Sequence, residues 1–146
     1  MSADSRQIGG IHYKTADPNG MQHWTYCALQ NIAYLEGCAT KYLMRWRSKG
    51  GLADLEKALH YVEKRVEMTN KPALEFNCGC RTGKLFDDLI ADNNIPDREA
   101  ALIDTIMHWR SKNELKLAGK ALAEFLLEMR NEQGQGPQSH GYVDQE

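Results

Sequence analysis

Three cationic side chains recur at intervals of four residues, at Lys41, Arg45 and Lys49. On a helix this spacing places them along one strip, one turn apart. Like charges held so close repel one another, and a phosphate-bearing ligand would turn that cost into attraction. Arginine would bind the phosphate in a bidentate manner and lysine as a point charge. The strip therefore predicts a local anion-binding site.

A carboxylate, Asp54, follows shortly after this strip, beyond a pair of glycines. It could orient Lys49 or Arg45, hold a magnesium ion, or accept a proton from a nucleophile. The alternative is structural: the cations form a solvated face, and Asp54 is a favourable charge near a helix N-terminus. Tyr42 and Tyr61 have two interpretations as well, as core residues with a hydrogen-bonded hydroxyl or as surfaces on which a base stacks.

Two helices joined by a turn are expected to position these residues. From residue 22 to 47 there is no proline, and apolar residues recur at intervals of three and four, with Gly37 the one expected break. The two glycines in residues 48–51 are typical of a turn. A second amphipathic helix follows through about residue 68 and carries Asp54 in a separate polar stripe. Residues 21–69 are therefore predicted to form a helical hairpin.

The remainder of the chain predicts a second helical hairpin, residues 70–132, packed on the first. It has a short helix at 84–92, a helix that begins after Pro96, and a last helix from 114 to about 132 with Leu117 among its inward-facing residues. The chain is expected to be all-α, with about five helices. Residues 1–20 are predicted to be an irregular arm and residues 133–146 a disordered tail.

The two halves of the chain resemble each other at a shift of 63 residues. Residues 44–49 read Met-Arg-Trp-Arg-Ser-Lys and residues 107–112 read Met-His-Trp-Arg-Ser-Lys, while Glu36 corresponds to Glu99. We interpret this similarity as two related hairpins packed as a bundle. Chance similarity between helices rich in leucine, lysine and alanine is the alternative.

Other residues with chemical potential form no complete motif. Residues 79–85 resemble a phosphate-binding glycine-rich loop, but only three residues separate the glycines and a leucine follows the lysine. Cys78 and Cys80 have the wrong spacing for a zinc knuckle, and Cys27 and Cys38 would be three turns apart on one continuous helix. No metal site is predicted, and none of the histidines at 23, 60, 108 and 140 is assigned to catalysis.

Composition excludes several classes of partner. The formal net charge is -2, so the chain has no basic excess to drive nonspecific binding to nucleic acid. Trp24, Trp46 and Trp109 have the spacing of core residues, which also argues against nucleic acid as a partner. The sequence has no apolar run of membrane-spanning length and no signal-like segment at its start, and we expect a cytoplasmic protein without a membrane partner.

An ordered series of residues in the first hairpin resembles the SaV-like family of small phage proteins, which includes a phage nucleotide kinase. The series consists of His12-Tyr13-Lys14, then Gly37-Cys38-Ala39-Thr40-Lys41-Tyr42-Leu43-Met44-Arg45, then Lys49-Gly50-Gly51, and finally Asp54-Leu55-Glu56-Lys57-Ala58-Leu59-His60-Tyr61. The resemblance covers roughly residues 11–67. One position departs from the family, since Cys38 stands where the family usually has asparagine.

The resemblance implies a helical phage protein of the host cytoplasm that acts on nucleotides. Its activity would be transfer of a phosphoryl group from a nucleoside triphosphate to a deoxynucleoside monophosphate, with Mg²⁺ compatible with the reaction. Lys41, Arg45 and Asp54 would be the catalytic residues. The substrate-binding residues would be His12, Tyr13, Lys49, Lys57 and Tyr61. The implied assembly is a homo-oligomer.

The roles in such a kinase would follow from positioning and charge, because phosphoryl transfer depends mainly on these two. Lys41, Arg45 and Lys49 would bind phosphates, Asp54 would orient a cation or metal, and His12 with Tyr13 would close over a base or sugar. The alternative is a helical protein without enzymatic activity that sequesters a nucleotide, a nucleotide signal or a host protein.

Overall fold

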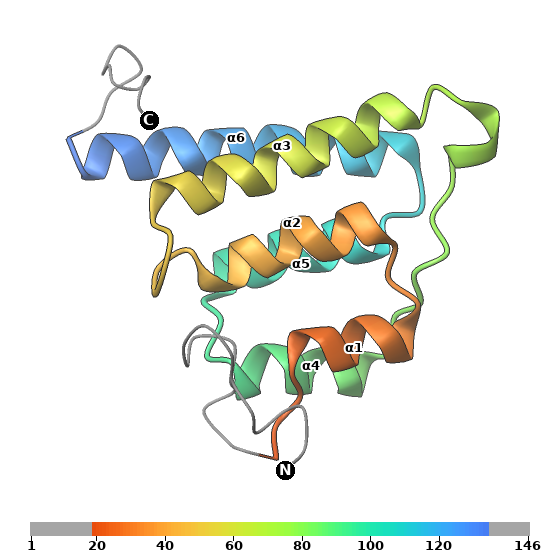
Figure 1. Ribbon diagram of the computed structural model, residues 1–146, viewed down its shortest axis with the longest axis horizontal. Coiled ribbons are helices and arrows are strands. Elements are labelled where there is room, and N and C mark those ends of the chain that lie inside the picture. Colours follow the sequence, from red (N-terminus) through yellow and green to blue (C-terminus); the bar gives the residue numbers. More distant parts are fainter. Residues whose placement is uncertain (1–18, 135–146) are drawn as a thin grey trace.

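The computed structural model describes residues 19–134. The regular secondary structure in this part of the chain is helical, as predicted. No strand occurs within this part of the chain. The helices are α1 (His23–Gln30), α2 (Tyr34–Arg45), α3 (Leu52–Met68), α4 (Gly83–Asp92), α5 (Asp97–His108) and α6 (Lys112–Glu132), with a short 3-10 helix at Pro72–Leu74 (Figure 1). The predictions for residues 1–18 and 135–146, which include most of the arm and the tail, lie outside the described residues.

Four long helices form the body of the protein, and two short ones lie beside it. α2 packs on α3 and α5, and α6 packs on α3 and α5, so that the two hairpins form a four-helix core. α1 and α4 lie side by side below the core in Figure 1. None of the described helices is long and apolar enough to cross a membrane.

Six α-helices occur between residues 19 and 134, where about five were expected, because the long helix predicted for residues 22–47 is two helices. Asn31 adopts a left-handed backbone (φ 55°, ψ 44°) and ends α1, with its N–H bonded back to the Cys27 carbonyl. Asparagine tolerates this conformation better than most residues. The break therefore lies at residues 31–33, and Gly37, the expected break, lies inside α2.

The internal similarity is structural as well as sequential. Shifting α2, Tyr34–Arg45, by 63 residues gives 97–108, the bounds of α5, and the same shift places α3 within α6. Each half therefore consists of a short helix followed by a long hairpin. This agreement favours two related hairpins over chance similarity.

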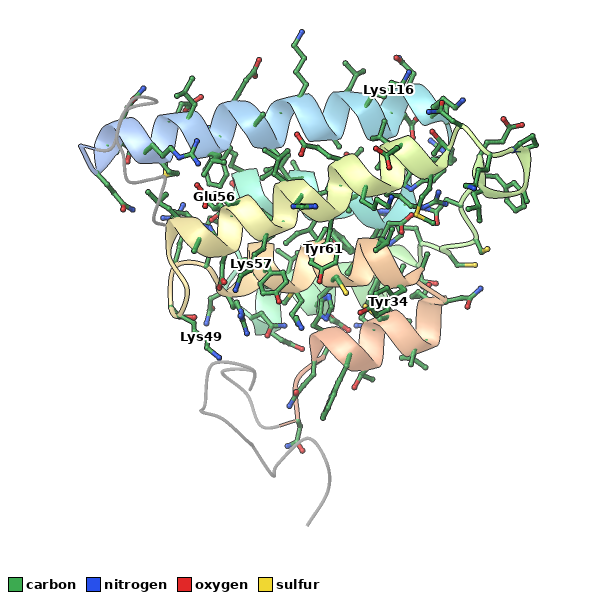
Figure 2. All side chains as sticks on the ribbon, turned by 45° about the horizontal axis from the view of Figure 1, so that its top comes forward. Tyr34, Lys49, Glu56, Lys57, Tyr61 and Lys116 are labelled. Carbon is green, nitrogen blue, oxygen red and sulfur yellow. The ribbon has the colours of Figure 1, made fainter. Side chains whose placement is uncertain are left out.

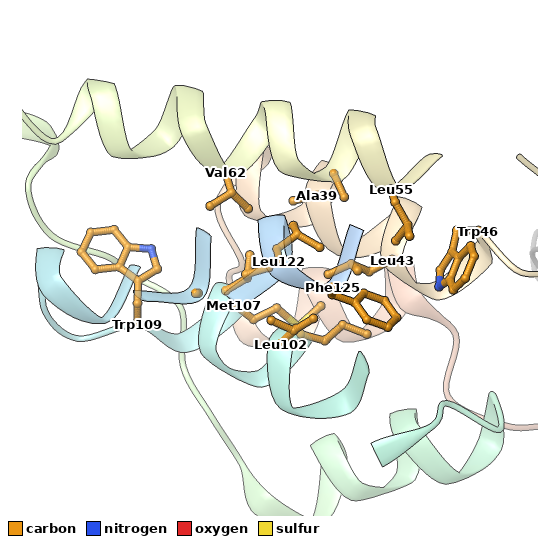
Figure 3. Close-up of a cluster of buried hydrophobic side chains, with 14 of the residues drawn as sticks. Ala39, Leu43, Trp46, Leu55, Val62, Leu102, Met107, Trp109, Leu122 and Phe125 are labelled. Atoms are coloured by element: carbon orange, nitrogen blue, oxygen red, sulfur yellow. The ribbon is translucent and has the colours of Figure 1, made fainter. Parts of the chain in front are cut away.

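Two buried glutamates join the halves reciprocally. Trp109 Nε1 donates a hydrogen bond to Glu36 Oε2 at 2.8 Å, and Trp46 Nε1 donates one to Glu99 Oε2 at 3.1 Å. Glu36 and Glu99 correspond at the shift of 63, as do Trp46 and Trp109. We call these four residues the reciprocal clamp. The two indoles lie at opposite ends of the apolar core in Figure 3.

An arginine completes each end of the clamp. Arg65 Nε donates to Glu36 Oε2 at 2.9 Å, and Arg47 Nε donates to Glu99 Oε2 at 2.7 Å. The second oxygen of each glutamate, Oε1, is buried without a hydrogen-bond partner among the described residues. In both halves, therefore, the glutamate Oε2 is hydrogen-bonded and the glutamate Oε1 is not.

Two apolar residues differ from the expected pattern of burial. Trp24 is 55% exposed on α1, and Leu117 is 57% exposed on α6. The core is formed instead by residues such as Leu43, Leu55 and Phe125 (Figure 3). Trp46 and Trp109 are buried, which confirms the packing role expected for those two tryptophans.

The reciprocal clamp predicts that the indole N–H groups matter to stability. Replacing Trp109 with Phe removes the donor to Glu36 and leaves a small cavity. We expect the free energy of unfolding to fall by about 2 to 4 kcal/mol. Urea unfolding followed by circular dichroism measures this change. The exposed Trp24→Phe is the matched control, with an expected loss within about 0.5 kcal/mol. Equal losses in the two variants would contradict the clamp.

Candidate functional site

The residues predicted to bind a nucleotide gather where α2 and α3 lie against each other. α2 contributes Lys41, Tyr42 and Arg45, and α3 contributes Lys57 and Tyr61. We call these five residues the aromatic–cationic face. Figure 2 shows Lys57 and Tyr61 between the two helices.

The other residues predicted to bind substrate are not part of the aromatic–cationic face. Lys49 lies at the turn between the helices, as Figure 2 shows, and is exposed. His12 and Tyr13 lie outside the described residues, so their expected closure over a base stays a prediction.

Two tyrosines form the centre of the aromatic–cationic face. The rings of Tyr42 and Tyr61 are stacked, with centroids 5.9 Å apart and planes 12° from parallel. Their register follows from the packing of α2 on α3, because each tyrosine lies at the boundary between the buried and exposed sides of its helix. Both rings are partly exposed, which combines the two interpretations of the tyrosines: each packs against a neighbour and still has surface available to a ligand.

Three cations surround the Tyr42 ring. The Arg45 guanidinium carbon lies 4.7 Å from the ring centroid, Lys41 Nζ lies at 5.0 Å, and Lys57 Nζ lies at 5.3 Å. Distances within about 6 Å are typical of cation–π attraction. The negative face of one ring thus partly offsets the mutual repulsion of the cations, and an anion would offset it further.

Arg45 and Asp54 form a buried ion pair. Arg45 Nε donates to Asp54 Oδ2 at 3.0 Å, and the two side chains are 10% and 1% exposed. The Asp54 carboxylate also accepts from the Gly50 N–H at 3.1 Å and lies 3.9 Å from Lys57 Nζ. Asp54 therefore ties the end of α2 to the start of α3. Among the roles considered from the sequence, this contact fits the orientation of Arg45.

The turn between α2 and α3 requires glycine for this arrangement. A Cβ atom on Gly50 would lie 2.1 Å from the Asp54 Cγ, and Gly51 has a positive φ of 60° that favours glycine. The glycine pair recognised in the sequence thus allows the backbone to approach the carboxylate closely.

A tyrosine and a cysteine extend the aromatic–cationic face toward the start of α2. Cys38 raises the pKa of both tyrosines, chiefly through a side-chain hydrogen bond with Tyr34 and chiefly through electrostatic interaction with Tyr61. Cys38 stands at the position where the resembling family has asparagine. The thiol thus occupies a place beside two tyrosine hydroxyls, where the family would have an amide.

A partly buried histidine, His23, lies close to Lys41. His23 Nε2 and Thr40 Oγ1 are 2.9 Å apart, and the Thr40 hydroxyl is 2.9 Å from the Glu36 carbonyl, to which it donates. Burial, assisted by the charge of Lys41, lowers the pKa of His23 from 6.5 to about 4. His23 is therefore neutral near pH 7, and it supports α2 without adding charge to the face.

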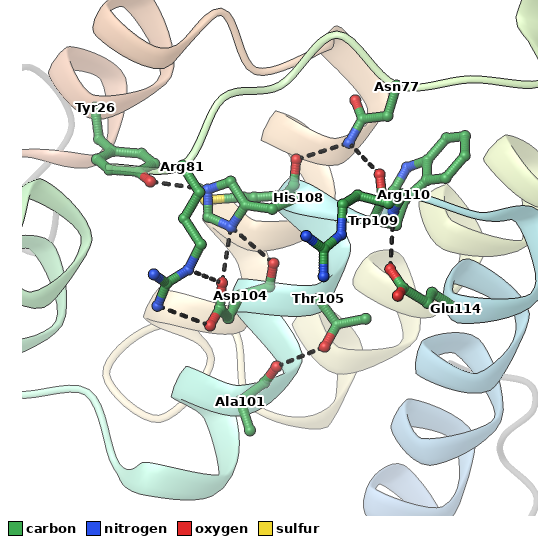
Figure 4. A network of polar contacts seen from close by, with 11 residues as sticks. Tyr26, Asn77, Arg81, Ala101, Asp104, Thr105, His108, Trp109, Arg110 and Glu114 are labelled. Carbon is green, nitrogen blue, oxygen red and sulfur yellow. Dashed lines mark hydrogen bonds and ion pairs between the residues drawn. The ribbon is translucent and has the colours of Figure 1, made fainter. Parts of the chain in front are cut away.

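A second polar cluster, which the sequence did not predict as a site, lies in the other half of the protein (Figure 4). His108 Nδ1 lies 2.8 Å from Asp104 Oδ1, and its Nε2 lies 2.8 Å from the Tyr26 hydroxyl. Arg81 contacts the same carboxylate at 2.8 and 3.1 Å. Burial opposes ionisation of Asp104, but the hydrogen bonds from Arg81 and His108 outweigh it and lower its pKa.

A groove of about 920 Å³ opens beside this cluster, between α5 and α6. Its lining includes Asp104, His108 and Arg110, together with small and apolar residues of both helices. A signal for this site was present in the sequence, since His108 and Arg110 belong to the segment that matches residues 44–49.

The geometry predicted for Cys27 and Cys38 needs correction. They lie on two separate helices, α1 and α2, and do not share one helix axis.

The ion pair predicts a large effect of Asp54 on stability. Asp54→Asn leaves Arg45 buried without a carboxylate, and we expect the free energy of unfolding to fall by about 3 to 5 kcal/mol. The matched control is Glu67→Gln, which removes the exposed partner of Lys64 on the same helix and should leave the free energy of unfolding nearly unchanged. Urea unfolding of both variants measures the difference. Similar small losses would show that the Arg45–Asp54 pair does not hold the hairpin.

The lowered pKa of His23 predicts a dependence of stability on pH. Below pH 6.5 the unfolded chain binds a proton at this imidazole, whereas the folded chain does so only near pH 4. Across this window, lowering the pH reduces the free energy of unfolding by up to about 1.4 kcal/mol per pH unit.

His23→Gln should therefore show a shallower dependence on pH than the wild type between pH 6.5 and 4. His60→Gln, on the exposed side of α3, should keep the slope of the wild type. Denaturant unfolding at several pH values gives the three slopes, and identical slopes for His23→Gln and the wild type would refute a buried neutral histidine.

Comparison of the chain with protein-family models, with curated proteins and with solved structures finds no match in any of the three. The SaV-like resemblance of residues 11–67 stays a prediction from the motif residues. The site is therefore interpreted from its own geometry.

Proposed function

We propose that the protein binds a nucleoside phosphate on the aromatic–cationic face. The observation that carries this proposal is the Tyr42 ring, which is stacked on Tyr61 and has three cations within 5.3 Å of its centroid. A nucleotide needs both kinds of contact, an aromatic surface for its base and positive charge for its phosphates.

The proposed role of each cation follows from how deeply its side chain is buried. Arg45 is buried and held by Asp54, so it supplies positive charge from beneath the Tyr42 ring. Lys57 is 54% exposed and Lys41 is partly exposed, so their ammonium groups can reach a phosphate. Lys49, at the turn, extends the positive surface along the same edge. The base would stack on the exposed surface of the tyrosine pair.

The activity proposed for this site is phosphoryl transfer between two nucleotides, as the SaV-like resemblance implies for a phage protein acting in the host. An oxygen of the deoxynucleoside monophosphate would attack the γ-phosphorus of the triphosphate. The bond to the β–γ bridging oxygen would break, and two diphosphates would leave. Lys41 and Lys57 would stabilise the charge on the transferred group. A second copy of the chain is the proposed source of the remaining acceptor contacts.

The carboxylate of this site does not fit a magnesium ion held by the protein. Asp54 is 1% exposed and is occupied by Arg45, the Gly50 N–H and Lys57. Any Mg²⁺ would arrive with the triphosphate as part of the substrate. Asp54 is therefore proposed as a residue that positions Arg45.

The same observation favours a second candidate function, capture of a nucleotide without turnover. A binding protein needs the stacked tyrosines and the cations, and it does not need a free carboxylate. In this alternative, the chain would sequester a nucleotide or nucleotide signal on the same face. The sequence also suggested an interaction with a host protein. No residue in the described part of the chain favours that interaction over nucleotide phosphorylation or nucleotide capture.

Binding and turnover can be separated in one set of experiments. Isothermal titration calorimetry with ATP and each of the four deoxynucleoside monophosphates measures affinity, and chromatography of the same mixtures detects diphosphates. Diphosphate formation supports the kinase, and binding without diphosphates supports capture. Absence of binding to every nucleotide would overturn the proposed function.

Three alanine variants locate the site. Lys41→Ala and Lys57→Ala should each raise the dissociation constant about tenfold, which is the effect of losing one charge-assisted hydrogen bond. Tyr61→Ala should weaken binding at least about fivefold through lost stacking. Lys64→Ala, seven residues beyond Lys57 on the same helix, should leave affinity unchanged. Binding that all four variants retain would place the nucleotide elsewhere.

A further inference from the structure

The groove between α5 and α6 is the counterpart of the aromatic–cationic face in the second half of the protein. Six of the residues that line the groove are Ala101, Asp104, Thr105, His108, Leu117 and Ala121. Subtracting 63 from each gives Cys38, Lys41, Tyr42, Arg45, Asp54 and Ala58. Five of these six positions differ in residue type between the halves. The fold thus presents the same location twice, with different chemistry.

The differences explain why the second location is hollow. In the first half, the large ring of Tyr42 fills the space between the helices and stacks on Tyr61. In the second half, Thr105 replaces that ring and Ala101 replaces Cys38. Leu117 stands where Asp54 would be, and it is 57% exposed. The groove of about 920 Å³ therefore has an apolar floor, and it is open chiefly because Thr105 stands where the Tyr42 ring lies in the first half.

One wall of the groove is polar and held in a fixed arrangement. Asp104 accepts from Arg81 and lies within hydrogen-bond distance of His108, which in turn contacts the buried Tyr26 hydroxyl (Figure 4). The Arg81 charge is thereby balanced by Asp104. These contacts link α1, α5 and the segment before α4, so the wall is set by three parts of the chain and cannot easily rearrange.

A second arginine on the groove, Arg110, is not balanced in this way. Its backbone N–H donates to Glu114 Oε1 at 2.8 Å, but its guanidinium has no hydrogen-bond or ion-pair partner among residues 19–134. The guanidinium lines the groove next to the apolar floor. An anionic group on a ligand would give Arg110 the bidentate partner that it lacks.

We propose that this groove is a second ligand site, which takes a small aromatic molecule with one anionic group. The aromatic body would lie on the floor formed by Ala101, Leu117 and Ala121, and the anion would pair with Arg110. Thr105 and His108 would lie beside the ligand and limit its shape. The volume falls within the roughly 300 to 1,000 Å³ of pockets that bind small molecules, and the lining combines apolar residues with polar and charged ones.

This site is independent of the nucleotide site proposed above. The aromatic–cationic face carries an excess of cations and suits a multiply charged phosphate. The formal charges of Arg81 and Arg110 in the groove cancel those of Asp104 and Glu114. The Arg110 guanidinium, which has no carboxylate contact among residues 19–134, suits a single negative charge. A ligand that occupies the groove would contact none of Lys41, Tyr42 or Lys57.

Titration with 2-naphthoate, followed by amide chemical shifts of the ¹⁵N-labelled full chain, tests the proposal. Saturable shifts confined to residues 79–81, 101–110 and 114–121 are the expected result. The uncharged analogue 2-naphthamide should bind about tenfold more weakly, and so should 2-naphthoate to Arg110→Gln, because both changes remove one charge-assisted contact.

Two further variants sharpen the test. Thr105→Tyr places in the groove the ring that Tyr42 provides in the first half, and it should abolish binding of 2-naphthoate while α5 stays folded. Lys116→Gln is the matched control on α6, because Lys116 is exposed and does not line the groove. It should leave the affinity unchanged.

Several results would overturn the second site. They are the absence of saturable shifts, shifts that map to α2 and α3, equal affinity for the acid and the amide, and undiminished binding to Thr105→Tyr. Nucleotide titration of the same variants keeps the two proposals apart. Loss of 2-naphthoate binding in Thr105→Tyr with unchanged nucleotide affinity supports the groove, whereas loss of both would refute its independence.

Discussion

The structure depends on two buried glutamates, each of which accepts a hydrogen bond at one oxygen across the boundary between the two halves of the chain. Glu36 and Glu99 are both 1% exposed. A carboxylate in an apolar interior is costly unless it is paired and hydrogen-bonded. Each glutamate takes an indole N–H from the other half and a guanidinium from an arginine. Neither hairpin can bury its glutamate in this way alone, so the clamp requires the two hairpins to pack on each other and determines where α2 meets α5.

The helical architecture was predictable because it depends on local periodicity. Apolar spacing and the glycine pair at 50–51 indicated the hairpins at 21–69 and 70–132. The end of α1 was not predictable in the same way, because Asn31 ends the helix through its backbone conformation while the apolar spacing continues past it. The match between Glu36 and Glu99 was visible in the sequence. Which carboxylate meets which indole was not, because that depends on how the hairpins cross.

The candidate sites show the same limit. The four-residue spacing correctly placed Lys41 and Arg45 one turn apart beside Tyr42, and the second helix supplied Tyr61. The burial of Arg45 by Asp54 depends on the close approach of Gly50, which no spacing rule describes. The groove was harder still to foresee. It results from small residues on two different helices, and a cavity has no sequence pattern of its own.

The reciprocity of the clamp has a consequence for the origin of the chain. Two separate and identical hairpins would satisfy it equally well, since each would offer its glutamate to the indole of the other. A homodimer of such hairpins could be joined into one polypeptide without losing a single contact at the clamp. After joining, the outer surfaces of the two hairpins would no longer have to be identical in sequence. Selection could then change one surface while the other kept its original function. The tyrosine at position 42 and the threonine at position 105 are the kind of difference that such a fusion permits.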